Sequence, residues 1–309
     1  MRDVRESTDV STPTSSFRSG FVSIVGKPNT GKSTLLNALV GTKLAAVTPK
    51  PQTTRARIQG VLTRRGAQII FLDTPGIHRP NSRLNMQMMA AVEEALSGVD
   101  LVLLVAEASK PRGEEDQLAV EVVKRSDVKA FLLLNKVDLI AKPRLLPLID
   151  AYQKEHNFAE FIPVSALHGD NLDLLEQKII EYLPTGPQYF PEDYLTDQPE
   201  YFLAAEIIRE KIFLETRQEV PYATAVVVDK FEESDVRLRI YATIFVEREG
   251  QKGIVIGAQG ERLKRIGQRA REELEFLLGR KVYLELFVKT QAEWRAHPGL
   301  ARLIDWRSS

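Results

Sequence analysis

The sequence predicts an α/β protein in which a doubly wound, mostly parallel sheet is followed by a smaller α+β domain. Apolar runs of strand length alternate with segments of helical periodicity from residue 21 to residue 183. Such alternation is typical of parallel sheets with right-handed crossovers. A proline-rich stretch at 184–187 then precedes a segment in which the elements follow a different order. The chain is therefore expected to contain two folding units joined by a stiff linker.

The first unit shows the alternation most clearly. Its strands are expected at 21–25, 69–72, 100–106 and 130–134, with a short strand ending at residue 164. Its helices are expected at 33–40, 82–96, 113–125, 144–154 and 171–183. Because ligands of open α/β sheets bind at the carboxyl ends of the strands, site residues are expected in the loops that follow them.

The second unit has the order helix–strand–strand–helix–helix–strand. A helix is expected from 201 to about 217, where Pro221 prevents its continuation. Apolar and polar residues alternate at 236–246 and again at 282–288, which predicts half-buried strands. Between these strands, a glycine-containing loop at 257–260 leads into a helix with apolar residues at helical spacing.

Composition narrows the class of protein. The 309 residues suit two domains, and we expect a disordered tail at 1–17, a first domain at 18–184, a linker at 185–200 and a second domain at 201–309.

With 42 basic and 42 acidic residues, net charge gives no argument for a nucleic-acid partner. The absence of cysteine excludes disulfides, and four scattered histidines do not suggest zinc. No apolar run reaches the length of a membrane span and the first residues do not form a signal peptide, so a cytoplasmic protein is expected. We expect it to be a monomer, although no motif determines the oligomeric state.

The first motif is GKPNTGKS at residues 26–33, which fits the phosphate-loop pattern G-x-x-x-x-G-K-[ST] between a strand and a helix. Glycines allow the chain to wrap closely around oxygen atoms, and the helix N-terminus attracts the phosphate anion. Lys32 would bind the β- and γ-phosphates, and the Ser33 hydroxyl would bind Mg²⁺. The residues expected to contact the nucleotide here are Gly26, Asn29, Thr30, Gly31, Lys32, Ser33 and Thr34.

A second motif, NKVD at 135–138, indicates that the base is guanine. The Asp138 carboxylate can accept two hydrogen bonds, from N1–H and N2–H₂, and adenine has no such pair of donors. Asn135 would brace the loop, and the stem of Lys136 can cover one face of the base. After the next strand, Ser165, Ala166 and Leu167 form a loop in which Ser165 and the Ala166 amide would contact O6 of guanine.

A third motif, DTPG at 73–76, also follows a strand. Asp73 can hold Mg²⁺ through water, and the Gly76 amide can contact a γ-phosphate. Ile77 follows Gly76 at a position from which a glutamine could orient an attacking water, and isoleucine can neither donate nor accept a hydrogen bond. Slow intrinsic hydrolysis is therefore expected. His78 is interpreted as a loop histidine, because attack by an in-line water needs no strong base.

The stretch 48–55, TPKPQTTR, resembles the first switch of the Era family of bacterial GTPases, as does GKPN in the phosphate loop. The resemblance implies a P-loop GTPase in which a switch threonine joins Mg²⁺, here Thr54 with Thr53 as the second choice. Lys32, Thr54 and Gly76 would then be catalytic, and Ser33, Thr54 and Asp73 would hold the metal. Asn29 also admits a K⁺ ion beside the phosphates. Arg55 and Arg57 could contribute to catalysis in cis, but they are expected to be solvated.

The second unit resembles a KH domain of the bacterial type, type II, whose signature is a G-x-x-G loop between two helices. Gly257 and Gly260 occupy that position, where glycines let the loop approach a single-stranded RNA backbone. Family members commonly carry lysine and glycine between them, whereas this chain has Ala258 and Gln259. The expected result is weaker RNA affinity, or a greater reliance on Lys252, Arg262 and Arg265. The expected RNA-binding residues are Lys252, Ile254, Ile256, Gly257, Ala258, Gln259, Gly260, Arg262, Lys264 and Arg265.

Together these resemblances imply a GTP-dependent clamp that binds the 3′ end of small-subunit ribosomal RNA and acts in assembly of the 30S subunit. Two alternatives stay open. One is an RNA-binding module with a non-catalytic nucleotide site, and the other is a regulatory GTPase associated peripherally with the inner face of the cell membrane. Trp294 and Trp306 are expected to be buried against the neighbouring domain.

Overall fold

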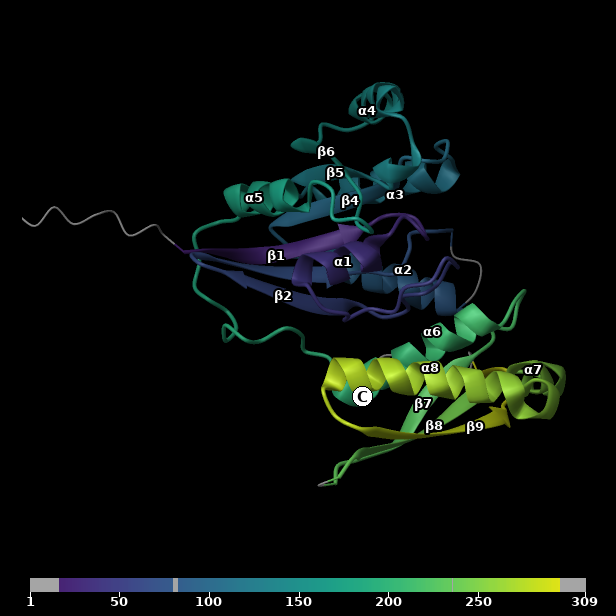
Figure 1. Cartoon of the computed structure of the whole chain (residues 1–309). Helices are drawn as coiled ribbons and strands as arrows, with labels where there is room; N and C mark the ends of the chain where they lie inside the picture. The colour runs from purple at the N-terminus through teal and green to yellow at the C-terminus, as the bar shows by residue number, and fades with distance from the viewer. Residues whose placement is uncertain (1–16, 80–82, 235, 295–309) are drawn as a thin grey trace, which may run out of the picture.

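The computed structural model describes residues 17–79, 83–234 and 236–294. The expected disordered tail, apart from residue 17, and Trp306 lie outside these ranges. The described chain forms two domains, with the second packed beneath the first in Figure 1. The predicted fold class is confirmed: a six-stranded, mostly parallel sheet is followed by a smaller domain with a three-stranded sheet.

The large sheet has the strand order β2-β3-β1-β4-β5-β6. Its strands are β1 Arg18–Val25, β2 Ile58–Arg64, β3 Ala67–Asp73, β4 Leu101–Glu107, β5 Ala130–Asn135 and β6 Glu160–Val164. All neighbours are parallel except β2, which pairs antiparallel with β3 at the edge. β2 is the one described strand of this sheet that the sequence pattern did not predict. The carboxyl ends of β1, β3, β4, β5 and β6 therefore meet along one edge of the sheet.

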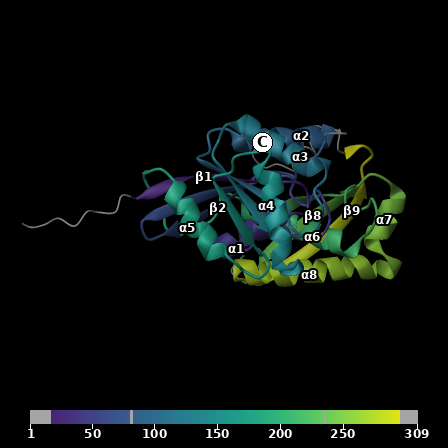
Figure 2. The ribbon, with the colours of Figure 1, turned by 90° about the horizontal axis from the view of Figure 1, so that it is seen from above.

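Helices cover both faces of this sheet, as the apolar pattern requires. They are α1 Lys32–Val40, α2 Arg83–Leu96, α3 Glu114–Ser126, α4 Leu145–Gln153 and α5 Leu172–Tyr182. One buried core includes residues of α1 and α5, and the other includes residues of α2, α3 and α4. Figure 2 shows α2 and α3 across the sheet from α1 and α5. The strands thus lie in a layer shielded from water on both sides.

The second domain has the predicted element order. Its elements are α6 Glu200–Glu215, β7 Ala225–Glu232, β8 Leu238–Val246, α7 Glu249–Ile256, α8 Glu261–Leu278 and β9 Val282–Thr290. β8 pairs antiparallel with β7 and parallel with β9. The alternating residues Leu238, Ile240, Ala242 and Ile244 face a core that α6 and α8 complete. Both helices lie on the side of the small sheet that faces the first domain (Figure 1).

The linker between the domains is fastened to the first domain. The backbone N–H of Val61 donates to Leu195 O at 2.8 Å, and Thr196 Oγ1 donates to Gln59 O at 2.7 Å. Gln68 binds the linker backbone at Tyr189 and Phe190. These bonds satisfy the edge strand β2 and fix the path by which the chain reaches α6.

Candidate functional site

The phosphate loop follows β1 and adopts a conformation that needs glycine. Gly26 and Gly31 have φ values of +150° and +95°. A Cβ added at Gly26 would lie 2.3 Å from Val105 O, and one at Gly31 would lie 2.3 Å from Asn135 Nδ2. Larger residues are therefore excluded by both backbone strain and contact.

The Lys32 amine lies inside this loop. Its Nζ donates to Gly26 O at 3.0 Å and to Lys27 O at 2.9 Å, and the residue is 6% exposed. Burial lowers the pKa of Lys32 to about 8, with the charge of Asp73 opposing that shift. The amine is thus held by two carbonyls at the position where the motif places the phosphates.

Three oxygen-bearing side chains meet beside the loop. Ser33 Oγ donates to Asp73 Oδ2 at 2.7 Å, the Ser33 and Thr54 hydroxyls are 2.8 Å apart, and Thr54 Oγ1 lies 3.4 Å from Asp73 Oδ2. Asp73 is fully buried and its Oδ1 has no hydrogen-bond partner. Burial raises the pKa of Asp73 to about 6, and Lys32 and the two hydroxyls oppose that shift. Hard oxygen donors around an orphaned carboxylate oxygen fit Mg²⁺.

The two switch threonines point to different partners. Thr53 Oγ1 bonds with Thr48 Oγ1 at 2.7 Å and donates to Lys50 O at 2.8 Å, so it is used within its own loop. Thr54 instead faces Ser33 and Asp73. The geometry therefore favours Thr54 over Thr53 as the residue that meets a metal.

Gly76 packs directly on the phosphate loop. A Cβ there would lie 2.7 Å from the Pro28 side chain and 2.8 Å from its backbone. The next residue, Ile77, is fully buried, and its N–H donates to Gly26 O at 3.0 Å. His78 is also buried, with Nδ1 at 2.7 Å from Gly76 O. The loop after β3 is thus seated against the phosphate loop by backbone contacts.

Two hollows adjoin at the site, and most of the residues expected to bind the base line one of them. This hollow is lined by Gly31, Thr34, Asn135, Lys136, Asp138, Leu139, Ala166 and Leu167. The hollow around the switch shares Gly31 and Thr34 with it and is also lined by Asn29, Lys32, Ser33, Thr54 and Gly76. Most of the residues expected to bind the nucleotide thus line these two adjoining hollows. Gly26, Thr30, Asp73 and Ser165 line neither of them.

Asn135 is the brace of this region. Its Nδ2 donates to Thr30 O at 2.7 Å, and its Oδ1 accepts from the Ala166 amide at 2.9 Å. The Ala166 amide, expected to face O6 of guanine, is thus bonded to Asn135 in this structure. Ser165 Oγ donates to Asp138 Oδ1 at 2.6 Å, which fixes the carboxylate.

Lys136 ties the two loops together. Its Nζ donates to Asn29 O at 2.7 Å and pairs with Glu107 at 3.2 Å. Asn29 Nδ2 in turn donates to Pro49 O at 3.1 Å. The base loop, the phosphate loop and the first switch are therefore joined by direct hydrogen bonds.

The expectation that Arg55 is solvated is wrong. Arg55 is 6% exposed, and its guanidinium donates to Thr224 O at 2.8 Å and Tyr222 O at 3.1 Å in the second domain. It also lies 5.6 Å from the centre of the Trp294 ring. Trp294 is fully buried beside this arginine of the first domain, as expected. Arg57 is partly buried and pairs with Glu94 at 3.4 Å.

The candidate RNA loop joins α7 to α8. Gly257 and Gly260 have φ values of +76° and +82°, and a Cβ at Gly257 would lie 2.7 Å from Arg262 Cβ. Gln259 also has a positive φ, 50°, which is uncommon for a residue other than glycine. Gln259 therefore adopts strained backbone at a position where glycine would not be strained.

The cations near this loop are less free than the sequence suggested. No acidic residue occurs from 262 to 271, yet Glu215 of α6 pairs with Arg265 at 3.3 Å and with Arg269 at 2.6 Å. Arg262 donates to Ile254 O, and Lys252 lies 4.0 Å from Glu249. Ile256, Ala258 and the exposed Lys264 complete the predicted surface around the loop.

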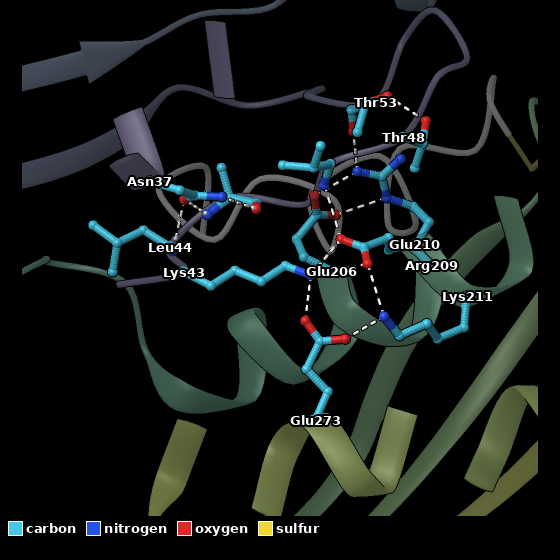
Figure 3. A network of polar contacts seen from close by, with 12 residues as sticks. Asn37, Lys43, Leu44, Thr48, Thr53, Glu206, Arg209, Glu210, Lys211 and Glu273 are labelled. Atoms are coloured by element: carbon cyan, nitrogen blue, oxygen red, sulfur yellow. Dashed lines mark hydrogen bonds and ion pairs between the residues drawn. The ribbon is translucent and has the colours of Figure 1, made fainter. Parts of the chain in front are cut away.

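Sequence reasoning missed a polar network between the domains, drawn in Figure 3. Lys43 of the first domain and Lys211 of α6 both bind two carboxylates, Glu210 of α6 and Glu273 of α8. Arg209 of α6 reaches the backbone of Thr53. One feature of the sequence could have indicated this network. Apolar residues occur all round α6, which predicts a helix that is buried on every side. The charged residues of such a helix need partners of opposite charge.

The fold and the site define a class of protein: a phosphate-loop, guanine-nucleotide-binding domain joined to a KH domain. Residues 21–136 match the family described as 50S ribosome-binding GTPase, and residues 219–295 match the KH domain. GTPase Era of Syntrophus aciditrophicus (strain SB) is 52% identical, covering 93% of this chain and 94% of its own. GTPase Era of Geobacter metallireducens is 53% identical, covering 90% and 94%. The chain belongs to the Era family of GTPases.

Solved structures agree with this assignment. Era in complex with MgGDPNP and nucleotides 1506–1542 of 16S ribosomal RNA has a TM-score of 0.91 and 44% identity, covering 94% of this chain and 99% of that one. A single-residue variant of Aquifex aeolicus Era bound to GDP.AlF4- has a TM-score of 0.90, also at 44% identity and with the same coverage of 94% and 99%. Separately, none of the helices in the described part of the chain is long and apolar enough to cross a membrane.

The lowered pKa of Lys32 predicts that nucleotide binding takes up a proton in alkaline solution. Above pH 8 the free amine is mostly neutral, whereas bound phosphate favours the charged form. We expect uptake of most of a proton per GDP at about pH 8.5, measured by calorimetry in buffers of different ionisation enthalpy. The same titration at about pH 7 is the control and should show little uptake. Equal values at both pH values would contradict the assigned pKa.

Proposed function

We propose that this chain is a GTP-hydrolysing switch that binds small-subunit ribosomal RNA through its KH domain and acts in assembly of the 30S subunit. The observation that carries the proposal is the meeting of Ser33, Thr54 and Asp73. These residues come from the phosphate loop, the first switch and β3, and their oxygens lie 2.7–3.4 Å apart. Because Thr54 belongs to this cluster, the position of the first switch would depend on whether Mg²⁺ and the γ-phosphate are bound beside it.

In this proposal each residue at the phosphates has a defined role. Lys32 would contribute positive charge to the transferred phosphoryl group, and the Gly76 amide would donate a hydrogen bond to it. Ser33, Thr54 and Asp73 hold Mg²⁺, which when bound neutralises charge on the phosphate oxygens. Since Asp73 is already buried and hydrogen-bonded, little reorganisation is needed when these charges develop.

No side chain in the glutamine position orients water, since Ile77 is apolar and fully buried. Asn29 offers a different contribution. Because its Nδ2 is bonded to Pro49 O, its Oδ1 is the atom available to a cation such as K⁺ beside the phosphates. Hydrolysis that depends on potassium, compared with sodium, would support this part of the proposal.

Guanine selection is assigned to the loops after β5 and β6. Asp138 would accept from N1–H and N2–H₂ of the base, with its carboxylate held in place by Ser165. Leu167 is 74% exposed at the rim of the hollow and can cover the base, as can the stem of Lys136. Contact between the Ala166 amide and O6 requires that amide to be shared with, or released from, Asn135.

The RNA partner is proposed from the KH domain and from the relative solved with nucleotides 1506–1542 of 16S ribosomal RNA. The loop at 257–260 would approach the RNA backbone, and Ile254, 40% exposed, would pack on a base. The site of action would be the cytoplasm, where 30S subunits are assembled, and the protein would act as a monomer.

We also propose domain boundaries. The GTPase domain would span 18–184, the linker 185–200 and the KH domain 201–309.

The membrane alternative has less support. The basic helix α8 presents its apolar stripe, Ile266, Ala270 and Leu274, to the core of the second domain, where all three are fully buried. That stripe is thus unavailable for insertion into lipid. The alternative of a non-catalytic nucleotide site is separated by measuring single-turnover hydrolysis.

Replacing Asp138 tests guanine recognition. Asp138→Asn should weaken GTP binding about 100- to 10,000-fold, because two hydrogen bonds to a charged group are lost at about 1.5–3 kcal/mol each. The same variant should bind xanthosine triphosphate better than GTP. Asp150→Asn is the matched control, since Asp150 is an exposed carboxylate of α4. Calorimetry showing unchanged GTP affinity, or equal ATP affinity in the wild type, would remove the assignment.

Replacing Lys264 tests the RNA surface. For Lys264→Ala we expect weaker binding of an RNA spanning nucleotides 1506–1542, the segment present in the relative's complex, and a logarithmic salt slope smaller by about 0.7. Lys281→Ala is the control, because Lys281 is 80% exposed just before β9, away from the loop. Fluorescence anisotropy across salt concentrations measures both quantities. If the two variants behave alike, the surface has been misplaced.

A further inference from the structure

The segment that carries Thr54 is held by the second domain. Residues 41–57 connect α1 to β2, and on one side of this segment the Thr54 hydroxyl faces Ser33 and Asp73. On the other side the segment lies on α6. Both residues that flank Thr54 are bonded to the second domain, and each bond involves a guanidinium.

The first anchor is Arg209, which donates from Nη2 to the carbonyl of Thr53. The same guanidinium is also held within α6. Its Nε donates to Glu206 Oε1 at 2.8 Å, and the centre of the Phe213 ring lies 5.3 Å from Cζ. Arg209 is 3% exposed and Glu206 is 8% exposed. A buried, charge-assisted hydrogen bond of this kind fixes the peptide that it meets.

The second anchor is Arg55, which immediately follows Thr54. It leaves the first domain and donates to the carbonyls of Tyr222 and Thr224. Thr54 thus lies between a carbonyl held by an arginine of α6 and a side chain held by the loop before β7. With both neighbours fixed, the direction of the Thr54 side chain is set.

An ion cluster holds the start of the same segment. The Val47 amide donates to Glu210 Oε2 at 2.8 Å, and Lys43 binds Glu210 and Glu273 (Figure 3). Lys211 completes the cluster, and its pKa is raised because Glu210 and Glu273 outweigh the effect of its burial. Each of the four charged side chains therefore has partners of opposite charge, which offsets the cost of burying them.

We propose that Arg209 is a positioning residue for GTP hydrolysis, holding the Thr53 carbonyl from the second domain so that the Thr54 hydroxyl faces Ser33 and Asp73. This inference rests on the proposed roles of Thr54 and Mg²⁺. It assigns to the KH domain a contribution to catalysis that is separate from RNA binding. Arg209 lines neither hollow of the nucleotide site, so its effect is expected in kcat and not in nucleotide affinity.

The test uses the full chain and single-turnover GTP hydrolysis. Arg209→Ala should lower the rate on the order of 10- to 100-fold, because a misdirected Thr54 is a small displacement at the reacting centre. Affinity for GDP should stay within about twofold, since the phosphate-loop contacts are intact. Arg209→Lys keeps a donor and should recover part of the rate. Arg280→Ala is the control: Arg280 is also ion-paired in the second domain, but with Glu200 and Glu233.

A second variant guards against loss of folding, because Arg209→Ala leaves Glu206 buried without its partner. Combining Arg209→Met with Glu206→Gln removes both charges at similar volume, and circular dichroism checks that it folds. A slow rate with normal GDP affinity in this variant supports the inference. A wild-type rate in either folded variant overturns it while leaving the proposed function standing. A wild-type chain that never hydrolyses GTP would overturn both.

Discussion

The phosphate-binding part of the nucleotide site is built around two buried groups of opposite charge, Lys32 and Asp73. Lys32 and Asp73 are 6% and 0% exposed, and burial drives both towards their neutral forms, with pKa values of about 8 and about 6. Each charge supports the other, and the hydroxyls of Ser33 and Thr54 support Asp73 further. Because an uncompensated buried charge is strongly destabilising, the loops that supply these partners must stay in place. The phosphate loop and the first switch are thus tied to one carboxylate.

The features of the site that depend on local chain geometry could be predicted from the sequence. The phosphate loop and the loop at 135–138 are short, follow buried strands, and contain their ligating atoms within a few residues. The antiparallel strand β2 could not be found in this way. Its residues include Gln59, Gly60 and Thr63, which give no regular apolar alternation. It is a strand because β3 and the linker supply hydrogen bonds on its two sides, and no local pattern contains that information.

Contacts between the domains were beyond sequence reasoning for a related reason. Arg55 was expected to be solvated, since an arginine in a polar loop usually is, but the second domain covers it with Trp294 and two backbone carbonyls. Charges on α6 such as Arg209 and Glu210 have their partners in the first domain only once the two domains are packed together. The Gln259 conformation is similar: the sequence shows a glycine replaced, whereas the structure shows that the left-handed backbone is retained at a cost in strain.

The last turn of α6 lies between the first switch and the arginines of α8. On one side Lys50 of the first switch donates to Phe213 O and Thr216 O there, at the negative end of the helix. On the other side Glu215 binds Arg265 and Arg269 of α8. On the proposed RNA surface, phosphates that attract these arginines would compete with Glu215, and so would act on the turn that Lys50 holds. Any such effect must be reciprocal, because a change that nucleotide makes in RNA affinity equals the change that RNA makes in nucleotide affinity. Coupling between nucleotide and RNA binding therefore requires only that the conformation of this turn differ between the nucleotide states. Such a difference would change the ion pairs that Glu215 makes with Arg265 and Arg269.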